Sequence, residues 1–143
     1  MLQDLTVVKR IVIRASAEAV WDALVDPDKI REYFFGTNTV SEWKEGSTLE
    51  FTGEWQGTRY RDAGTIRTFR PPQVLSYDYH SSFSPLPDAP ENRSLITFTL
   101  ERAPEGCALH LEQRGFPDET ARAHSEASWN AVLDGLKSVA ERG

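Results

Sequence analysis

The chain has 143 residues, 39% of them hydrophobic, and a formal net charge of −6 at pH 7. This length suits one domain over residues 1–143, and the single cysteine, Cys107, excludes an internal disulfide. The basic residues are scattered among more numerous acids, so we expect no nucleic-acid partner. No apolar run has membrane-spanning length and the N-terminus lacks a signal pattern, so we expect a cytoplasmic protein with no membrane span.

The first quarter of the chain predicts one strand and two short helices. The segment "LTVVKRIVIRA", residues 5–15, is rich in β-branched side chains, which favour a strand. In "SAEAVWDALVDPDKIREYF", Ser16 is a suitable N-cap, and Pro27 stands where one helix ends and a second begins. The second helix runs into three consecutive aromatic residues, Tyr33, Phe34 and Phe35, which one buried face cannot hide together.

Residues 47–116 show strand patterns separated by turn signals. In "STLEFTGEW" the residues Leu49, Phe51 and Trp55 alternate with polar ones and share a face. The dipeptide Gln56-Gly57 predicts a tight turn into the next strand. Further strands are expected in "TRYRDAGTIRTF", "VLSYDYH", "SLITFTLER" and "CALHLEQRGF". Since their connections have hairpin length, the sheet must be antiparallel.

The hydrophobic period then changes to that of a helix. The segment "TARAHSEASWNAVLDGLKSVAE", residues 120–141, carries apolar side chains at helical spacing and predicts the longest helix. A strand, two short helices, a run of about six strands and a long final helix indicate an α+β fold with an antiparallel sheet of about seven strands. Only the final helix is long enough to cover one face of this sheet.

The final helix is uneven along its predicted inner face. Its C-terminal half is large and apolar, whereas its N-terminal half offers Ala121, Ser125 and Ser128. The sheet opposes it with large aromatic residues, which are Phe51, Trp55, Tyr77, Tyr79 and Phe98. Small residues facing large ones indicate either tight interdigitation or space for a ligand, since ligand cavities are mostly apolar with a few polar groups.

Gln113 and the aromatic triplet extend the cavity hypothesis. By alternation Gln113 shares a face with Leu109 and Leu111, so it is expected to point inward, either as a satisfied core amide or as a ligand contact. The triplet would lie at the mouth of the cavity, with Phe116 after the last strand at the same end. The long loop "SSFSPLPDAPENR" would bring Phe83 there, unless it is only a stiff connector.

These motifs together resemble the helix-grip superfamily, the START-like or SRPBCC proteins, and most closely the branch named for the C-terminal domain of the activator of a heat-shock-protein ATPase. The resemblance covers nearly the whole chain and rests on "IVIRASAEAVWDALVDPDKIREYF", "EGSTLEF", "AGTIRTFRPPQVLSYDY", "ALHLEQRGF" and "SWNAVLDGLKSVAE". It implies a curved antiparallel sheet wrapped around the long C-terminal helix and enclosing a cavity. Family members often carry a tryptophan where this chain has Tyr33, and a histidine where it has Gln113.

The sequence has no recognisable catalytic or metal-binding motif. Its histidines, at positions 80, 110 and 124, lack the spacing of a metal site, and no cofactor motif is present, so we predict neither a metal nor a cofactor. Asp62 is the best candidate general base if its strand register points it inward, but a bulge near Gly64 would change that. We therefore regard an enzyme as less favoured than a binding protein, and we assign no catalytic residue.

Three functions follow from these observations. The leading one is binding of a small hydrophobic or amphipathic molecule between the last helix and the sheet, with the ligand-binding set Tyr33, Phe34, Phe35, Phe51, Trp55, Tyr77, Tyr79, Phe83, Phe98, Gln113, Phe116, Ser125, Ser128, Trp129 and Val132. The second, implied by the resemblance, is regulation of a chaperone ATPase or of another partner protein, although we expect this chain to lack the N-terminal domain of those activators. The third is a cavity enzyme such as a cyclase or hydrolase.

The aromatic mouth is compatible with a monomer or a homodimer.

Overall fold

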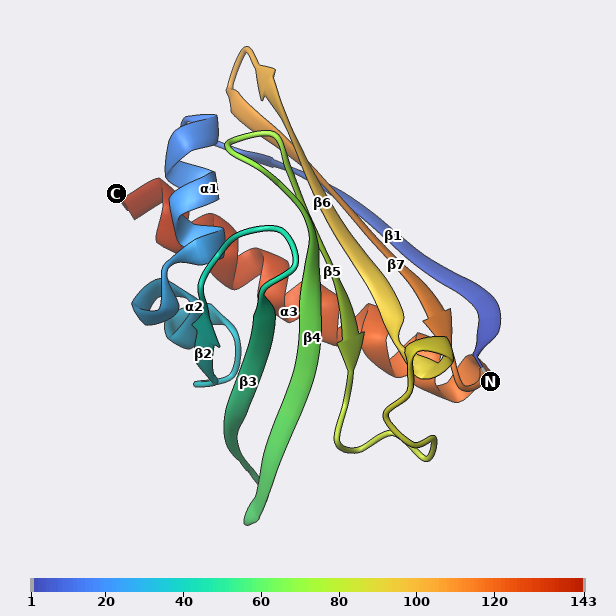
Figure 1. The fold of residues 1–143 in the computed structure, drawn as a ribbon. Helices are drawn as coiled ribbons and strands as arrows, with labels where there is room; N and C mark the ends of the chain where they lie inside the picture. The colour runs from blue at the N-terminus through green and yellow to red at the C-terminus, as the bar shows by residue number, and fades with distance from the viewer. Residues whose placement is uncertain (1, 143) are drawn as a thin grey trace.

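One antiparallel sheet of seven strands forms most of the molecule. The computed structural model describes residues 2–142, and its sheet has the order β1-β7-β6-β5-β4-β3-β2 (Figure 1). The strands are β1 (Gln3–Ile13), β2 (Asn38–Ser41), β3 (Thr48–Trp55), β4 (Thr58–Arg70), β5 (Val74–His80), β6 (Ser94–Ala103) and β7 (Gly106–Phe116). The first strand pairs with the last one, so the chain crosses from one edge of the sheet to the other between β1 and β2.

The three helices cover the concave face of the sheet. The long helix α3 (Glu119–Arg142) runs across this face, and the short helices α1 (Ala17–Val25) and α2 (Pro27–Tyr33) pack near its C-terminal end (Figure 1). A one-turn 3-10 helix, η1 (Pro90–Asn92), lies between β5 and β6. The expected α+β helix-grip fold, with two short helices after the first strand and a long final helix, is confirmed.

The junction of α1 and α2 follows from two residues. Asp26 ends α1, and its side chain accepts a 2.9 Å hydrogen bond from the backbone N–H of Asp28, so it also caps α2. Pro27 occupies the first turn of α2, where its missing N–H costs nothing. The carbonyl of Ala23 would normally bond to the N–H of residue 27, which proline lacks. The Tyr33 hydroxyl donates to that carbonyl at 2.8 Å instead.

Close packing between α2 and α3 depends on a glycine. A Cβ atom at Gly135 would lie 2.7 Å from the Cβ of Tyr33, so only glycine lets the two helices approach this closely. The C-terminal half of α3 is buried through six residues, Trp129, Val132, Leu133, Leu136, Val139 and Ala140. The large apolar half of the helix therefore lies against α1, α2 and the sheet, whereas the half with the small residues continues along the sheet past α1 and α2.

The sequence patterns did not predict strand β2, but they did predict the turn that joins β3 to β4. Gln56 and Gly57 have φ values of 50° and 81°, as expected for a tight hairpin turn between β3 and β4. The strand β2 has four residues and pairs with Leu49–Thr52, so the end of β3 around Trp55 has no partner strand on its outer side.

Candidate functional site

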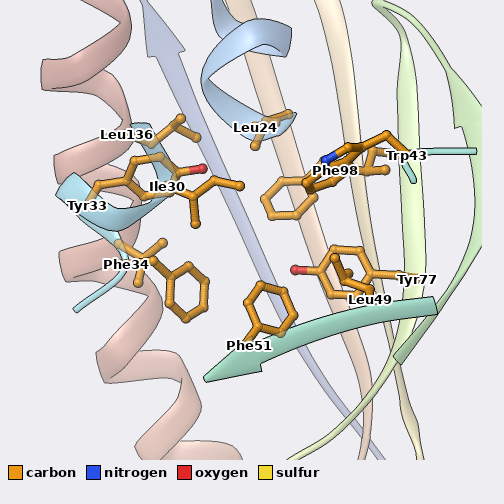
Figure 2. A pocket seen from close by; sticks show the side chains of 12 residues that line it. Leu24, Ile30, Tyr33, Phe34, Trp43, Leu49, Phe51, Tyr77, Phe98 and Leu136 are labelled. Atoms are coloured by element: carbon orange, nitrogen blue, oxygen red, sulfur yellow. The ribbon is translucent and has the colours of Figure 1, made fainter. Parts of the chain in front are cut away.

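A small cavity lies where the three helices meet the concave face of the sheet (Figure 2). Its volume is about 20 Å³, room for about one water molecule. The wall is almost entirely apolar and aromatic, and consists of Leu24, Ile30, Tyr33, Phe34, Trp43, Leu49, Phe51, Leu75, Tyr77, Phe98, Val132 and Leu136. Side chains thus fill most of the space between helix and sheet, and a larger guest requires some of them to move.

Tyr77 supplies a free polar atom to this cavity. Its side chain is only 5% exposed and its hydroxyl points into the space between Phe51 and Phe98 (Figure 2). No residue between 2 and 142 forms a hydrogen bond with this hydroxyl, in contrast to those of Tyr33 and Tyr79. Burial raises the pKa of Tyr77, so the phenol remains neutral. A hydroxyl without a partner in an apolar cavity is unfavourable, and a hydrogen-bonding guest would supply the missing partner.

The three rings of the aromatic triplet point in three different directions. Tyr33 is buried against α1, as described above, and Phe34 is half-buried on the cavity wall. Phe35 is 52% exposed, and its ring meets that of Trp55 edge-on with centroids 6.2 Å apart. The triplet therefore links the core, the cavity and the surface at one point of the chain.

Phe34 lies at the edge of the cavity that faces the open end of the sheet. Its ring stacks on Phe51 with a centroid separation of 5.8 Å, and meets Trp129 edge-on at 6.0 Å. In Figure 2 these two phenylalanine rings face each other at the edge of the cavity. Phe34 is therefore a cavity-wall residue that is also partly exposed to solvent.

The backbone after Phe34 is strained. Helix α2 ends in a Schellman motif, in which the Gly36 N–H donates to the Arg31 carbonyl at 3.2 Å. Phe35 takes the left-handed position of this motif with φ 52°, where glycine is the usual residue and a bulky side chain costs about 1 kcal/mol. Local stability is thus traded for an aromatic side chain at the surface.

The inward orientation of Gln113 is observed, and its amide is bonded to protein groups. Its Oε1 accepts hydrogen bonds from the Ser125 hydroxyl and from the Trp129 indole N–H, both at 2.7 Å. Its Nε2 donates to the Ser94 hydroxyl at 3.1 Å. The network connects β7 with α3 and β6, and none of its members lines the cavity. It anchors the middle of α3 to the sheet.

The concave face continues past Phe51 to a buried carboxylate. Asp62 on β4 points inward and is 7% exposed. Its Oδ1 accepts from the Ser82 backbone N–H at 2.8 Å and from the Ser82 hydroxyl at 3.1 Å, and its Oδ2 accepts from the Tyr79 hydroxyl. Burial first, and the Asp62 charge second, raise the pKa of Tyr79 well above its ordinary range. Tyr79 therefore acts as a neutral donor that holds the carboxylate in place.

Four aromatic side chains form the outer part of this face, and we call them the aromatic rim. They are Phe35, Trp55, Tyr60 and Phe83, of which Tyr60 is half-buried and the others are about half exposed. Tyr60 lies over Gly53, where a Cβ would be 2.6 Å from the Tyr60 hydroxyl, and its ring is 6.0 Å from that of Phe83. The β3–β4 hairpin carries Trp55 and Tyr60, and the loop of residues 81–93 carries Phe83, both at the lower end of Figure 1, whereas Phe35 lies in the connection between α2 and β2.

The predicted ligand-binding set falls into several places. Six members line the cavity, namely Tyr33, Phe34, Phe51, Tyr77, Phe98 and Val132. Phe35, Trp55 and Phe83 belong to the rim, Tyr79 binds Asp62, and Gln113, Ser125 and Trp129 form the network. Phe116 is buried beside β1, paired with Gln3, and Ser128 is half-buried on α3. Their role in ligand binding stays a prediction.

Sequence reasoning missed half of the cavity wall. Trp43 enters it from the β2–β3 connection with φ 56°, a backbone state that no sequence pattern predicted. Leu49 could have been found, because it alternates in phase with Phe51. The other unpredicted members are Leu24, Ile30, Leu75 and Leu136, all of them ordinary core residues in a sequence.

The described part of the chain holds no cluster of three potential metal ligands. None of the helices over residues 2–142 is long and apolar enough to cross a membrane.

Comparison with known proteins gives one family. The model of the family "Activator of Hsp90 ATPase homolog 1-like protein" matches residues 14–141. No curated protein matches the sequence. The solution structure of ChR145 from Cytophaga hutchinsonii is similar, with 42% identity, a TM-score of 0.82, and coverage of 99% of this chain and 97% of that one.

Two further structures show the same architecture. The crystal structure of MLL2253 from Mesorhizobium loti has 26% identity and a TM-score of 0.77, and the match covers 96% of this chain and 98% of that one. The solution structure of the Aha1 dimer from Colwellia psychrerythraea has 20% identity and a TM-score of 0.75, with 96% of each chain covered. At that identity the second likeness concerns the fold alone.

Proposed function

Since the chain belongs to the family of Activator of Hsp90 ATPase homolog 1-like proteins, we propose that it works through the cavity of that fold, as a binding protein for a small apolar or amphipathic molecule. The guest would lie between α3 and the sheet, with Phe34 turned outward. The observation that carries the proposal is the hydroxyl of Tyr77, which has no hydrogen-bond partner among residues 2–142 and points into a largely apolar cavity. A core built only for stability would favour phenylalanine at this position.

The strained segment after α2 supports an opening movement. Phe34 closes the cavity, and the following residues Phe35 and Gly36 both have left-handed backbones, with φ values of 52° and 73°. Glycine adopts this backbone freely, but a non-glycine residue such as Phe35 is strained there, and strained positions cluster at ligand clamps and switch regions. A guest that enters would exchange the Phe34–Phe51 contact for its own contacts with Phe51, Tyr77 and Phe98.

Native mass spectrometry of the isolated protein tests this proposal. A stoichiometric extra mass that disappears on denaturation would identify the guest by extraction. If the protein is isolated without a guest, titration with a neutral apolar probe such as octanol follows. Saturable binding at one site, weakened by Tyr77→Phe, is the expected result, and absence of binding would contradict the proposal.

A second candidate function is that of a protein-partner module, and the exposed pair Phe35 and Trp55 favours it. Two half-exposed aromatic rings in contact on a strained turn form a small apolar surface beside the unpaired end of β3. By analogy with the family description, a chaperone ATPase is the partner to test. An unchanged ATPase rate of the purified chaperone on addition of this protein would remove this candidate.

A further inference from the structure

Asp62 is a buried charge that the protein leaves without a counter-charge. No lysine, arginine or histidine nitrogen within residues 2–142 lies within 4.0 Å of its carboxylate. The neighbouring Arg61 forms its ion pair with Glu50 instead. Burying an unpaired carboxylate is expensive, and hydrogen bonds from neutral donors offset only part of that cost.

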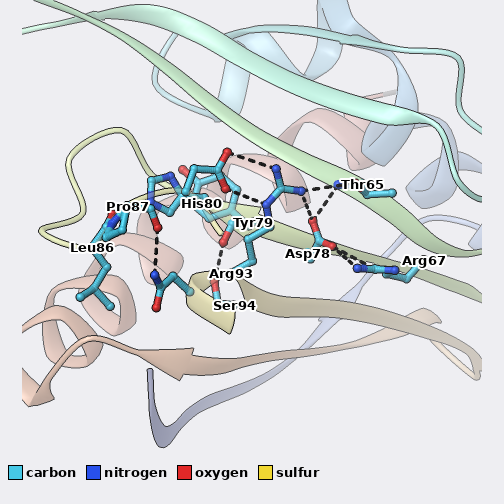
Figure 3. Close-up of polar contacts among 11 residues, drawn as sticks. Thr65, Arg67, Asp78, Tyr79, His80, Leu86, Pro87, Arg93 and Ser94 are labelled. Atoms are coloured by element: carbon cyan, nitrogen blue, oxygen red, sulfur yellow. Dashed lines mark hydrogen bonds and ion pairs between the residues drawn. The ribbon is translucent and has the colours of Figure 1, made fainter. Parts of the chain in front are cut away.

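Asp78 shows that this chain can neutralise a buried carboxylate. Its exposure of 6% is close to that of Asp62, yet it forms two ion pairs (Figure 3). The Arg67 Nη2 atom lies 2.6 Å from its Oδ2, and the Arg93 Nη1 atom lies 2.9 Å from its Oδ1. Arg93 also binds Asp88, which ties the loop of residues 81–93 to the sheet. The loop that brings Ser82 to Asp62 is therefore tied to the sheet at Arg93, and of the two buried aspartates within residues 2–142 only Asp62 lacks an ion pair.

The surroundings of Asp62 suit an organic cation. Phe51 is its cross-strand partner and Tyr79 is bonded to it. Tyr60 is two residues away on the same face of β4, and Phe83, whose ring is 6.0 Å from that of Tyr60, follows Ser82, which is bonded to Asp62. The faces of aromatic rings attract ammonium groups. An ionised carboxylate has about four acceptor positions, and three are used by Ser82 and Tyr79, so one position on Oδ2 is left for a donor.

We infer that Asp62 and the aromatic side chains Tyr60, Tyr79 and Phe83 form a binding site for the ammonium group of an organic amine. The inference rests on the proposed function for the apolar part of the molecule, which would extend past Phe51 toward Tyr77. The two rings of Phe51 and Tyr79 are 5.8 Å apart, and those of Phe51 and Tyr77 are 6.0 Å apart, so the two regions are contiguous. The preferred ligand class is thus an amphipathic amine, and anionic amphiphiles are disfavoured.

Calorimetric titration with octylamine, octanol and octanoate at neutral pH tests this inference. The three probes share one apolar chain and differ in charge. Octylamine is expected to bind about tenfold more tightly than octanol, because a charge-assisted hydrogen bond to a desolvated carboxylate is added. Octanoate is expected to bind more weakly than octanol. Asp62→Asn should remove the preference for the amine and leave the affinity for octanol within about twofold.

Two variants distinguish binding of the amine at Asp62 from nonspecific attraction of a cation to a protein of net charge −6. Glu50→Gln removes a carboxylate from the neighbouring strand on the opposite face, and should leave the amine preference unchanged. Phe83→Ala removes an exposed ring and leaves the core intact. It should weaken the binding of octylamine several-fold and leave the binding of octanol unchanged. Equal affinities for octylamine and octanol, or equal losses in Asp62→Asn and Glu50→Gln, would overturn the inference and leave the proposed function standing. Absence of binding by every probe would overturn both.

Discussion

The ring of Phe34 stacks on the ring of Phe51 with centroids 5.8 Å and planes 20° apart, and both rings line the cavity. Phe51 borders both candidate binding regions, because it lines the cavity with Tyr77 and is the cross-strand partner of Asp62. Phe34 is half-buried, so we expect entry into the cavity to depend on the position of its ring.

Removal of the Phe34 ring should open the cavity. Phe34→Ala is expected to lower the free energy of unfolding by about 2 kcal/mol, less than for a fully buried phenylalanine. It should also tighten octanol binding, because the guest no longer has to displace the ring. Chemical denaturation and calorimetry measure the two effects. Phe35→Ala is the matched control on the adjacent exposed ring, and an equal gain in affinity in both variants would contradict the assigned role of Phe34.

The hydroxyls of Tyr33 and Tyr77 should have opposite effects on stability. Tyr33→Phe removes the 2.8 Å bond to the Ala23 carbonyl, which Pro27 leaves without a helical donor, so unfolding should become easier by about 1 kcal/mol. Tyr77→Phe removes a hydroxyl that has no partner in the described chain, and should be neutral or stabilising by up to about 1 kcal/mol. Parallel denaturant titrations compare them. Destabilisation by Tyr77→Phe equal to that by Tyr33→Phe would show that the hydroxyl is satisfied.

The hydrogen bonds of Gln113 should contribute more to the free energy of unfolding than an average buried contact. Gln113→Leu leaves the Trp129 indole N–H and the Ser125 hydroxyl without their acceptor, and should destabilise the protein by about 2–4 kcal/mol. Glu112→Leu changes the adjacent exposed position and should stay within about 0.5 kcal/mol. Thermal or denaturant unfolding followed by tryptophan fluorescence measures both. Similar losses for the two variants would contradict the anchoring role.

Alkaline pH should unfold the protein through its buried tyrosines. Burial raises the pKa of Tyr33, Tyr77 and Tyr79 above the ordinary value of 10.0. Above about pH 10 the unfolded chain releases these protons while the native state keeps them, so the contribution of the tyrosines to stability is constant below that pH and falls as the pH rises further. Tyrosinate absorbance and near-ultraviolet circular dichroism should therefore change together. Ionisation of all the tyrosines near pH 10 with the native dichroism intact would contradict this expectation.

The residues that determine the fold could be interpreted from sequence because their signals are local. Asp26 and Pro27 mark a helix boundary by backbone chemistry alone, and Gln56-Gly57 marks a hairpin turn in the same way. The inward direction of Gln113 followed from strand alternation, which a regular strand preserves. Such features need no knowledge of distant parts of the chain.

The candidate site could be predicted only in part, because it depends on long-range packing. The cavity is far smaller than the small residues on α3 suggested, since Phe34 and Trp43 fill space from connections whose left-handed backbones have no sequence signature. Asp62 depended on the register of β4, and its inward position became clear only when the irregularity of β4 was found beyond it, between Ile66 and Thr68. The partner of the Ser125 hydroxyl, likewise, is set by tertiary structure.

The measurement that tests the central claim most directly is heteronuclear NMR of the leucine and valine methyl groups during an octanol titration. A guest in the cavity should shift the methyl groups of Leu24, Leu49 and Leu136, which line it, and leave those of the exposed residues Val8 and Val40 unchanged. We expect this pattern with saturation at one site. Absence of any shift at the three leucines, with changes confined to residues beside the rim, would contradict binding in the cavity.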